Sequence, residues 1–235
     1  MDPITLAAIA LGSALFLGGK KKGGGGGGSS VHKGGWGVKG SEDRVYWLNE
    51  IRTMSNWYTN TFGSMPYLAD YLTVVGYIEA NFNPSALNPE YKTNPANAAR
   101  GLFGMRPETA FQTKYGTQFM SPYPNALMNP KWAFVMAVHH IYWACTRVHD
   151  MQSGVVDWAA IRRWWGVPLR VHDFNFEHSY SKGNLDRFED KLHKCNSAYG
   201  TNIDPDFVWV KISGWQNYPG LEVMIKSFGL QGVYA

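Results

Sequence analysis

The chain has 235 residues, of which 45% are hydrophobic and 17% charged, and this composition excludes a disordered or collagen-like protein. Two cysteines are too few for a scaffold built on disulfides, so a hydrophobic core must supply the stability. The net charge of +4 lies entirely in residues 1–40, so residues 41–235 are neutral overall. The composition of the main domain therefore gives no support for nucleic-acid binding.

Residues 4–17 form an uncharged apolar run, which two glycines extend and Lys20, Lys21 and Lys22 close. A helix of sixteen residues is about 24 Å long, against roughly 30 Å of bilayer hydrocarbon, and lysine snorkelling with local thinning can close that gap. We therefore expect residues 1–19 to be a membrane anchor that contacts the lipid bilayer through residues 4–19. A signal peptide, which would carry its positive charge before the apolar run, and an interfacial or buried tail are the alternatives.

Residues 20–40 are rich in lysine and glycine and are expected to form a flexible linker. The glycine run contains the pattern GxGxxG, but no βαβ unit surrounds it, so a phosphate-binding loop is not expected. The lysines that follow the apolar run predict that the remainder of the chain, residues 41–235, lies on the cytoplasmic side of the membrane.

Residues 41–235 predict a single domain that is mainly α (α+β), with long loops. Apolar residues at spacings of three and four predict helices over 41–58 and 66–80, and the prolines and asparagines after residue 80 predict a long loop. The same reasoning places further helices at about 107–115, 130–149, 155–165, 185–199 and 219–228. Strand-like alternation is scarce, and its best candidate is the segment 207–212.

Glu79 is the carboxylate whose position is most informative. It lies in the last turn of the second predicted helix, where unpaired backbone carbonyls disfavour negative charge. The apolar neighbours Val75, Ile78 and Phe82 would also exclude water from the carboxyl group. Both effects favour the protonated form that a general acid needs at neutral pH. Without further information, an exposed glutamate at a helix end is the more common arrangement.

Two motifs follow one another in this region: residues 79–86 read EANFNPSA and residues 101–110 read GLFGMRPETA. They resemble the soluble-type lytic transglycosylases, which share the lysozyme-like fold with goose-type lysozymes. The first family pattern, Glu-Ser-x-Phe/Trp-x-Pro-x-Ala, is matched except that Ala80 replaces the serine. The second, Gly-Leu-Met-Gln-x-Met-Pro-x-Thr-Ala, is matched except at Phe103, Gly104 and Arg106. The resemblance covers about residues 65–145.

The resemblance implies a lysozyme-like helical domain in which Glu79 is the catalytic residue. The substrate would be the peptidoglycan glycan strand, cleaved at the β-1,4 bond between N-acetylmuramic acid and N-acetylglucosamine without a metal or cofactor. Glu79 would protonate the leaving oxygen and then act as a base while the muramyl C6 hydroxyl closes a 1,6-anhydro ring. The substrate N-acetyl group would support the oxocarbenium centre. Hydrolysis with a second carboxylate, from Glu90 or Glu108, remains an alternative.

The resemblance also places residues along the sugar cleft. The expected substrate-binding residues are Leu102, Phe103, Gly104, Met105, Arg106, Trp164 and Trp165. Gly104 cannot supply the side-chain amide of the glutamine found in the family, and Arg106 puts a cation where the family has a thioether.

The group that orients the catalytic carboxyl is left open by the sequence. In the family it is the tyrosine of an Ala-Tyr-Asn-Ala-Gly element, and the nearest counterpart here is RRWWG at residues 162–166. If the two glycines are aligned, Arg163 takes the position of the tyrosine, where an arginine beside Glu79 would favour the charged carboxylate, against the acid role. A shift of one residue brings Trp164 to the cleft instead.

Two smaller features carry less weight. His172, Asp173, Glu177 and His178 match no zinc spacing, so no metal site is expected. Cys145 and Cys195 fall on separate predicted helices and either form a bridge or remain buried thiols.

The predicted topology places the domain on the cytoplasmic side, whereas peptidoglycan lies outside the cell. A bacterial virus with an internal membrane would reconcile the two, because the cytoplasmic face of the host lipid then faces the capsid, and the enzyme would meet the cell wall at entry. A bacterial cell-envelope enzyme of reverse orientation is the simpler alternative. The non-enzymatic alternative is a catalytically inactive lysozyme-like structural or glycan-binding membrane protein.

Overall fold

The structure is a computed structural model that describes residues 41–110, 124–152, 154–165 and 179–231. The predicted anchor at 1–19, the linker at 20–40 and the His172–His178 cluster lie outside these ranges, so those predictions stay untested. None of the helices within the described ranges combines the length and the apolar character that a bilayer crossing requires.

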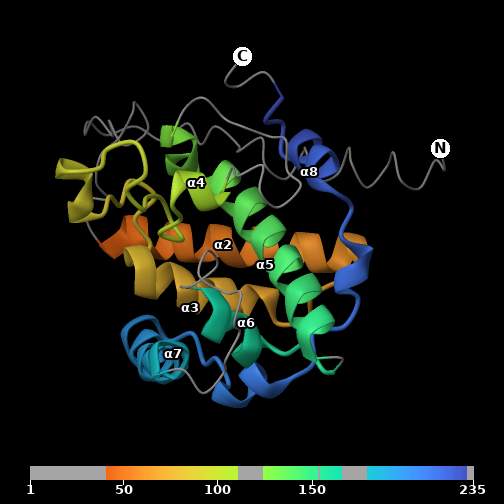
Figure 1. Cartoon of the computed structure of the whole chain (residues 1–235). Coiled ribbons are helices and arrows are strands. Elements are labelled where there is room, and N and C mark those ends of the chain that lie inside the picture. Colours follow the sequence, from red (N-terminus) through yellow and green to blue (C-terminus); the bar gives the residue numbers. More distant parts are fainter. Residues whose placement is uncertain (1–40, 111–123, 153, 166–178, 232–235) are drawn as a thin grey trace, which may run out of the picture.

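The described part of the chain is mainly helical, which confirms a helical domain (Figure 1). The α-helices are α2 (Ser41–Phe62), α3 (Leu68–Ala80), α4 (Pro107–Ala110), α5 (Pro130–Gln152), α6 (Trp158–Trp165), α7 (Ser179–Tyr199) and α8 (Leu221–Ser227). Short 3-10 turns are η1 (Pro89–Lys92), η3 (Pro124–Met128), η4 (Pro205–Trp209) and η5 (Trp215–Asn217). The extended pairing within the described ranges consists of isolated bridges, of which two join Arg100 to Leu87 and to Met105.

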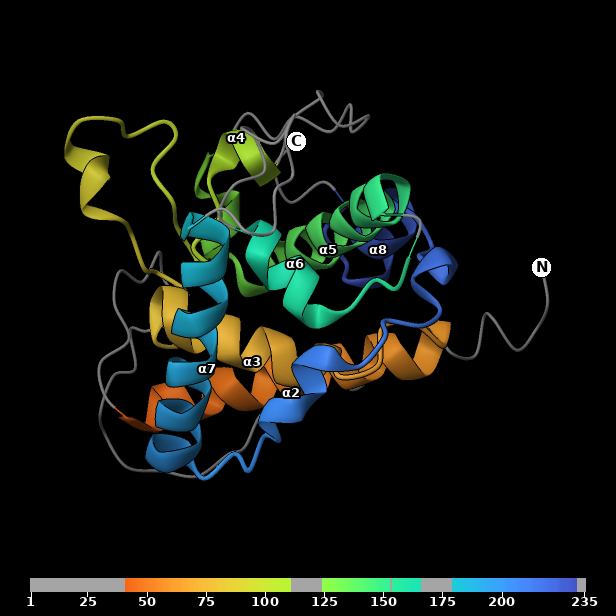
Figure 2. The same ribbon diagram turned by 60° about the horizontal axis from the view of Figure 1, so that its bottom comes forward.

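Helix α3 is the central element of the domain. It lies beside α2 in Figure 1, and α7 crosses it in Figure 2. Most of its first nine residues are buried, and the polar exception among them, Thr73, donates its hydroxyl to the carbonyl of Ala69 at 2.6 Å. A helix that is apolar on all sides belongs in the interior of a domain. The core position of α3 therefore carries its last turn, with Glu79, to the edge of the core.

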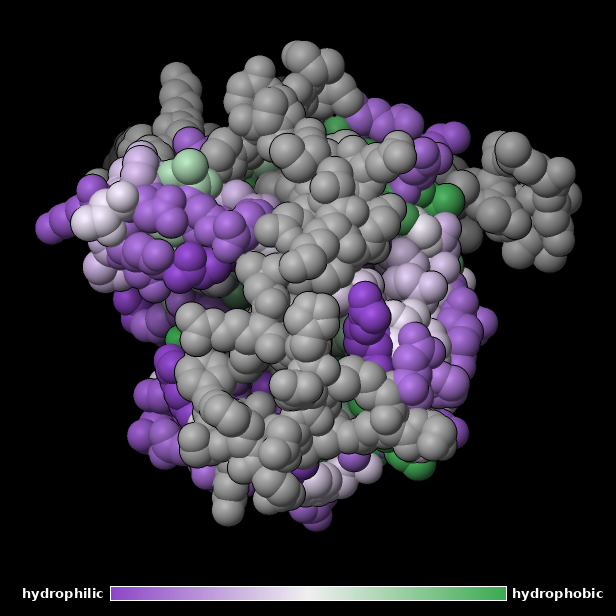
Figure 3. Space-filling view, viewed as in Figure 1, coloured by the Kyte–Doolittle hydropathy of each residue, from purple (hydrophilic) through white to green (hydrophobic). Residues whose placement is uncertain are grey.

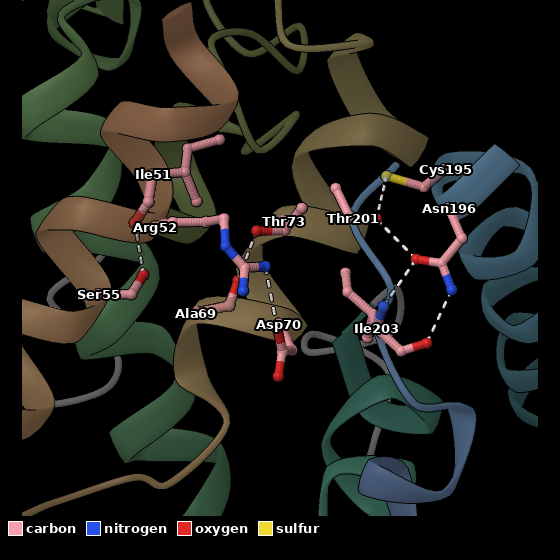
Figure 4. A network of polar contacts seen from close by, with 10 residues as sticks. All are labelled: Ile51, Arg52, Ser55, Ala69, Asp70, Thr73, Cys195, Asn196, Thr201 and Ile203. Carbon is pink, nitrogen blue, oxygen red and sulfur yellow. Dashed lines mark hydrogen bonds and ion pairs between the residues drawn. The ribbon is translucent and has the colours of Figure 1, made fainter. Parts of the chain in front are cut away.

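Polar contacts tie the first half of α3 to α2 and fix the turn that follows α7 (Figure 4). Arg52 of α2 forms an ion pair with Asp70 of α3 at 3.0 Å. In the last turn of α7, the Asn196 side chain donates to the carbonyl of Ile203 at 2.7 Å and accepts from its N–H at 2.9 Å and from the hydroxyl of Thr201 at 2.6 Å. The turn that leaves α7 is thereby locked by one side chain.

The predicted strand at 207–212 is wrong. Residues Pro205–Trp209 form the 3-10 turn η4 instead. The Asp204 carboxylate accepts the N–H of Asp206 at 3.0 Å, and a proline at the first position of the turn fixes its φ angle. This local cap competes with an extended conformation, and only Lys211 makes a bridge, to Asp157.

The two cysteines do not form a bridge. Cys145 on α5 and Cys195 on α7 are both free and fully buried. Burial raises the pKa of the Cys195 thiol to about 11 and raises that of the Cys145 thiol still further above its usual range. Both therefore stay protonated and act as small apolar side chains.

Candidate functional site

The end of α3 positions Glu79. Asn81 and Phe82 both adopt the left-handed conformation, with φ of 47° and 58°, and the N–H of Phe82 donates to the carbonyl of Gly76 at 3.1 Å. This conformation is unfavourable for residues other than glycine. The fully buried Phe82 ring, which packs edge-on against Tyr199 with centroids 5.1 Å apart, stabilises it here. The helix consequently ends at one defined residue, and Glu79 occupies a fixed place.

The Glu79 carboxylate is paired with Arg162 of α6. Its Oε1 atom accepts from Nη2 at 3.3 Å and from Nη1 at 3.4 Å. The Glu79 side chain is 25% exposed, whereas that of Arg162 is only 2% exposed. The Glu79 carboxylate therefore contacts a buried cation through Oε1 and is also partly exposed to solvent.

Helix α7 supports Arg162 from behind. The Arg162 Nε atom donates to the backbone carbonyl of Asn184 at 3.4 Å, and its guanidinium lies 5.7 Å from the centre of the Phe188 ring. Tyr71 is fully buried nearby, where burial raises the pKa of its hydroxyl above the usual range and the positive charge of Arg162 acts in the opposite direction. Arg162 is therefore fixed by several groups, and it holds Oε1 in one orientation.

The second carboxylate oxygen faces a tight turn. Arg100 and Met105 exchange backbone hydrogen bonds of 3.0 and 3.1 Å, and Gly104 within this turn has a φ of 57°. A Cβ atom on Gly104 would lie 2.9 Å from the Cβ of Glu79 and 3.2 Å from its Oε2. The glycine therefore allows the turn to approach Glu79 while its second oxygen remains uncovered by a side chain.

Glu79 lines two adjoining hollows. The larger one is a cleft of about 270 Å³, which is lined by Glu79, Asn88, Ala99, Gly104, Met105, Arg106, Thr109, His140, Arg162, Trp165, Asn184 and Arg187. A smaller hollow of about 190 Å³ shares Glu79, Asn88, Ala99 and Gly104 with it. Glu79 is the only acidic residue in either lining, within the ranges that the structure describes. Hydrophilic side chains gather over the neighbouring loop after α3, on the left of Figure 3.

His140 and Trp165 form the inner wall of the cleft. Their rings meet edge to face, with centroids 4.9 Å apart and an interplanar angle of 87°. Burial lowers the pKa of His140 to about 3, and the neighbouring His139 acts in the same direction. His140 is therefore neutral at physiological pH, and it adds no charge to the cleft.

The residues expected to bind substrate divide into two groups. Gly104, Met105, Arg106 and Trp165 line the cleft. Leu102 and Phe103 line neither hollow, and both are fully buried in the core, so the structure does not bring these two side chains to the cleft. A Cβ atom on Gly101, whose φ is 77°, would lie 1.9 Å from the carbonyl oxygen of Leu127, so this turn packs directly against the 3-10 turn η3. The side chain of Trp164 lies outside the described part of the structure.

The arginine beside Glu79 is Arg162, not Arg163. Successive residues of a helix are rotated by about 100° about its axis, so the two side chains leave α6 in different directions. Arg163 acts on Asp157, whose charged form it favours, and its own side chain is half-buried. The arginine that the structure brings to Glu79 is therefore the chain neighbour of the one that the glycine alignment suggests.

Arg106 lines the same cleft as Glu79 but is paired with a different carboxylate. Its guanidinium forms a two-point ion pair with the Glu90 carboxylate, with contacts of 2.5 and 3.3 Å. The third acidic residue of the motif region, Glu108, is exposed on α4 and lines neither hollow.

Seven of the twelve described residues that line the larger cleft were not expected from the sequence, namely Asn88, Ala99, Thr109, His140, Arg162, Asn184 and Arg187. The spacing of Asn184 and Arg187, three residues apart on a helix, was the available signal. Among the described residues, no group of three or more His, Cys, Asp or Glu side chains could hold a metal ion. No protein-family model, curated protein or solved structure matches this chain, so the resemblance to lytic transglycosylases stays a prediction.

Proposed function

We propose that the chain is a peptidoglycan lytic transglycosylase with a lysozyme-like domain, in which Glu79 acts first as the acid and then as the base. One observation carries this proposal. Glu79 is the single carboxylate of the described cleft lining, its Oε1 is held by Arg162, and its Oε2 faces the Gly104 turn. One oxygen is fixed and the other is left for proton transfer.

In the proposed reaction the glycan strand occupies the two hollows that Glu79 lines. In the free protein Glu79 is the carboxylate partner of Arg162, so the reaction begins when Oε2 takes up a proton from solvent. Oε2 then donates this proton to the glycosidic oxygen as the bond to the muramyl C1 breaks. The substrate N-acetyl group supports the positive charge at C1. Oε2 then takes the proton of the muramyl C6 hydroxyl while that oxygen bonds to C1, which closes the 1,6-anhydro ring and returns Glu79 to its protonated form.

Hydrolysis with two carboxylates has less support. Two-carboxylate glycosidases place the groups roughly 5–9.5 Å apart across the bond that is cleaved. Here Glu90 is engaged with Arg106, and Glu108 is exposed outside both hollows. Within the described ranges, neither of these carboxylates lines a hollow in which a glycan strand would lie beside Glu79. This arrangement favours the mechanism with one carboxylate.

The test compares the full-length chain with its Glu79→Gln and Glu108→Gln variants on purified peptidoglycan. We expect the wild type and Glu108→Gln to release soluble fragments at similar rates, because Glu108 lies outside the cleft. Glu79→Gln should lose at least a hundredfold in rate, the scale of general acid–base catalysis. Equal release by all three proteins would end the assignment of Glu79.

A binding protein without activity is the second candidate, because Arg162 is buried and Glu79 supplies its counter-charge. In that case the ion pair stabilises the fold and the cleft only holds the strand. Binding of peptidoglycan by the wild type without fragment release would favour this candidate.

The same proposal includes the predicted membrane anchor at residues 1–19, in the internal membrane of a virion or in a bacterial envelope. Protease digestion of residues 41–235 is compared between intact and opened particles or vesicles. It shows whether the domain is enclosed or faces the outside. Cleavage in intact virions would contradict an internal location.

A further inference from the structure

Helix α7 contributes two hydrogen-bond donors to the cleft that the proposed reaction does not use. Asn184 and Arg187 both line it. They are three residues apart, so they lie on one face of the helix, one turn from each other. Asn184 also accepts the Nε hydrogen of Arg162 through its backbone carbonyl, which connects this wall directly to the partner of Glu79.

The charges of the cleft are balanced except at Arg187. Arg162 is paired with Glu79, and Arg106 is paired with Glu90. Arg187 is exposed and takes part in none of the ion pairs between described residues. The lining as a whole therefore presents an uncompensated positive charge.

The Asn184 amide is unsatisfied as well. Its Nδ2 atom is buried and donates to no acceptor within the described ranges. A buried donor without an acceptor is costly, so such a group in a cleft marks a place for a ligand acceptor. Because the terminal torsion of asparagine is soft, the amide can turn its N–H groups toward a bound oxygen.

We propose that Asn184 and Arg187 form a binding site for a carboxylate of the glycan strand. Both side chains offer N–H donors, and a guanidinium can bind a carboxylate through two parallel hydrogen bonds. No acidic residue of the described cleft lining competes for Arg187, since Glu79 is engaged by Arg162. This inference rests on the proposed function, and it makes the enzyme selective for anionic strands.

Two carboxylates of peptidoglycan have the required chemistry. Strands with intact stems carry the carboxylates of the peptide. Strands whose stems have been removed by an amidase carry the free lactyl carboxylate of the muramyl residue. Chitohexaose, a neutral β-1,4 oligomer of N-acetylglucosamine, carries neither and is the matched neutral probe.

The experiment measures dissociation constants for these three probes by calorimetry, with full-length Glu79→Gln protein so that the strands stay intact. In that background Arg187→Gln is compared with Arg187→Lys and with Arg147→Gln. The last variant removes an exposed arginine that lies outside the cleft lining. We expect Arg187→Gln to weaken binding of at least one anionic probe about tenfold, as for a lost charged hydrogen bond, and to leave chitohexaose unchanged.

The pattern of losses identifies the ligand. A loss confined to stem-bearing strands assigns the peptide carboxylate, and a loss confined to amidase-treated strands assigns the lactyl carboxylate. Arg187→Lys should recover part of the affinity, and Arg147→Gln should bind as the background protein does. Equal losses for the anionic and neutral probes, or no loss at all, would overturn the carboxylate site.

The failure of the proposed function is distinguishable from this outcome. If wild-type protein releases fragments from peptidoglycan but Arg187→Gln binds all probes like the background, only the carboxylate site is overturned. If wild-type protein neither cleaves peptidoglycan nor binds any probe, the proposed function is overturned together with it.

Discussion

Removal of either partner of the Glu79–Arg162 pair should destabilise the domain, and removal of both should cost less than the sum. Breaking a buried ion pair costs about 3–5 kcal/mol. Glu79→Gln leaves the Arg162 guanidinium, which is 2% exposed, without a counter-charge. We expect this variant to lose about 3 kcal/mol of the free energy of unfolding. Arg162→Met leaves a carboxylate that is 25% exposed and can be hydrated, so the expected loss is smaller, about 2 kcal/mol.

The double variant Glu79→Gln/Arg162→Met has no uncompensated charge. We expect it to lose about 3 kcal/mol, which gives a coupling energy of about 2 kcal/mol. The free energy of unfolding is measured by urea denaturation at pH 7, followed by near-ultraviolet circular dichroism. A loss of about 5 kcal/mol in the double variant, the sum of the single losses, would show that the side chains are independent. The claim that Arg162 fixes Oε1 would then be refuted.

Three further predictions concern the cleft and the core. Gly104→Ala should lower activity at least tenfold, because its Cβ would lie 2.9 Å from the Cβ of Glu79. Gly200→Ala, with a similar φ of 63° and nothing within 4 Å, should lose about 1 kcal/mol of stability but no activity, and equal activity of both variants would refute the contact. Because burial lowers the pKa of His140 to about 3, its proton binds preferentially to the unfolded chain. The free energy of unfolding should therefore fall as pH decreases below about 6.5, by up to about 1.4 kcal/mol per pH unit. Urea denaturation at a series of pH values should show a weaker pH dependence for His140→Gln than for the wild type. Both cysteines are free and buried, so a thiol reagent should modify them only in denaturant, and rapid modification of the native protein would contradict that burial.

The helices were predictable because their apolar residues repeat with the helical period. The predictions for α2, α3 and α5 lie within a few residues of the observed bounds. The start of α7 was missed because its first six residues, SYSKGN, lack an apolar repeat and include Gly183. The segment 207–212 has the alternation of a strand, but the cap made by Asp204 and Pro205 decides its conformation.

The site was predictable only in part. The resemblance placed Glu79 at the end of α3, where the structure has it. The resemblance suggested Arg163 or Trp164 and did not point to Arg162, because a change of one residue in the alignment changes the face of the helix. It also could not separate Gly104, which lines the cleft, from Leu102 and Phe103, because which side of a turn meets the core depends on tertiary packing.

The most direct test of the account is mass spectrometry of the fragments that the full-length chain releases from peptidoglycan. The proposed reaction, in which the muramyl C6 hydroxyl rather than water closes onto C1, predicts fragments with 1,6-anhydromuramyl ends from the wild type and essentially none from Glu79→Gln. Fragments that have instead gained one water molecule and carry reducing ends would contradict the single-carboxylate mechanism.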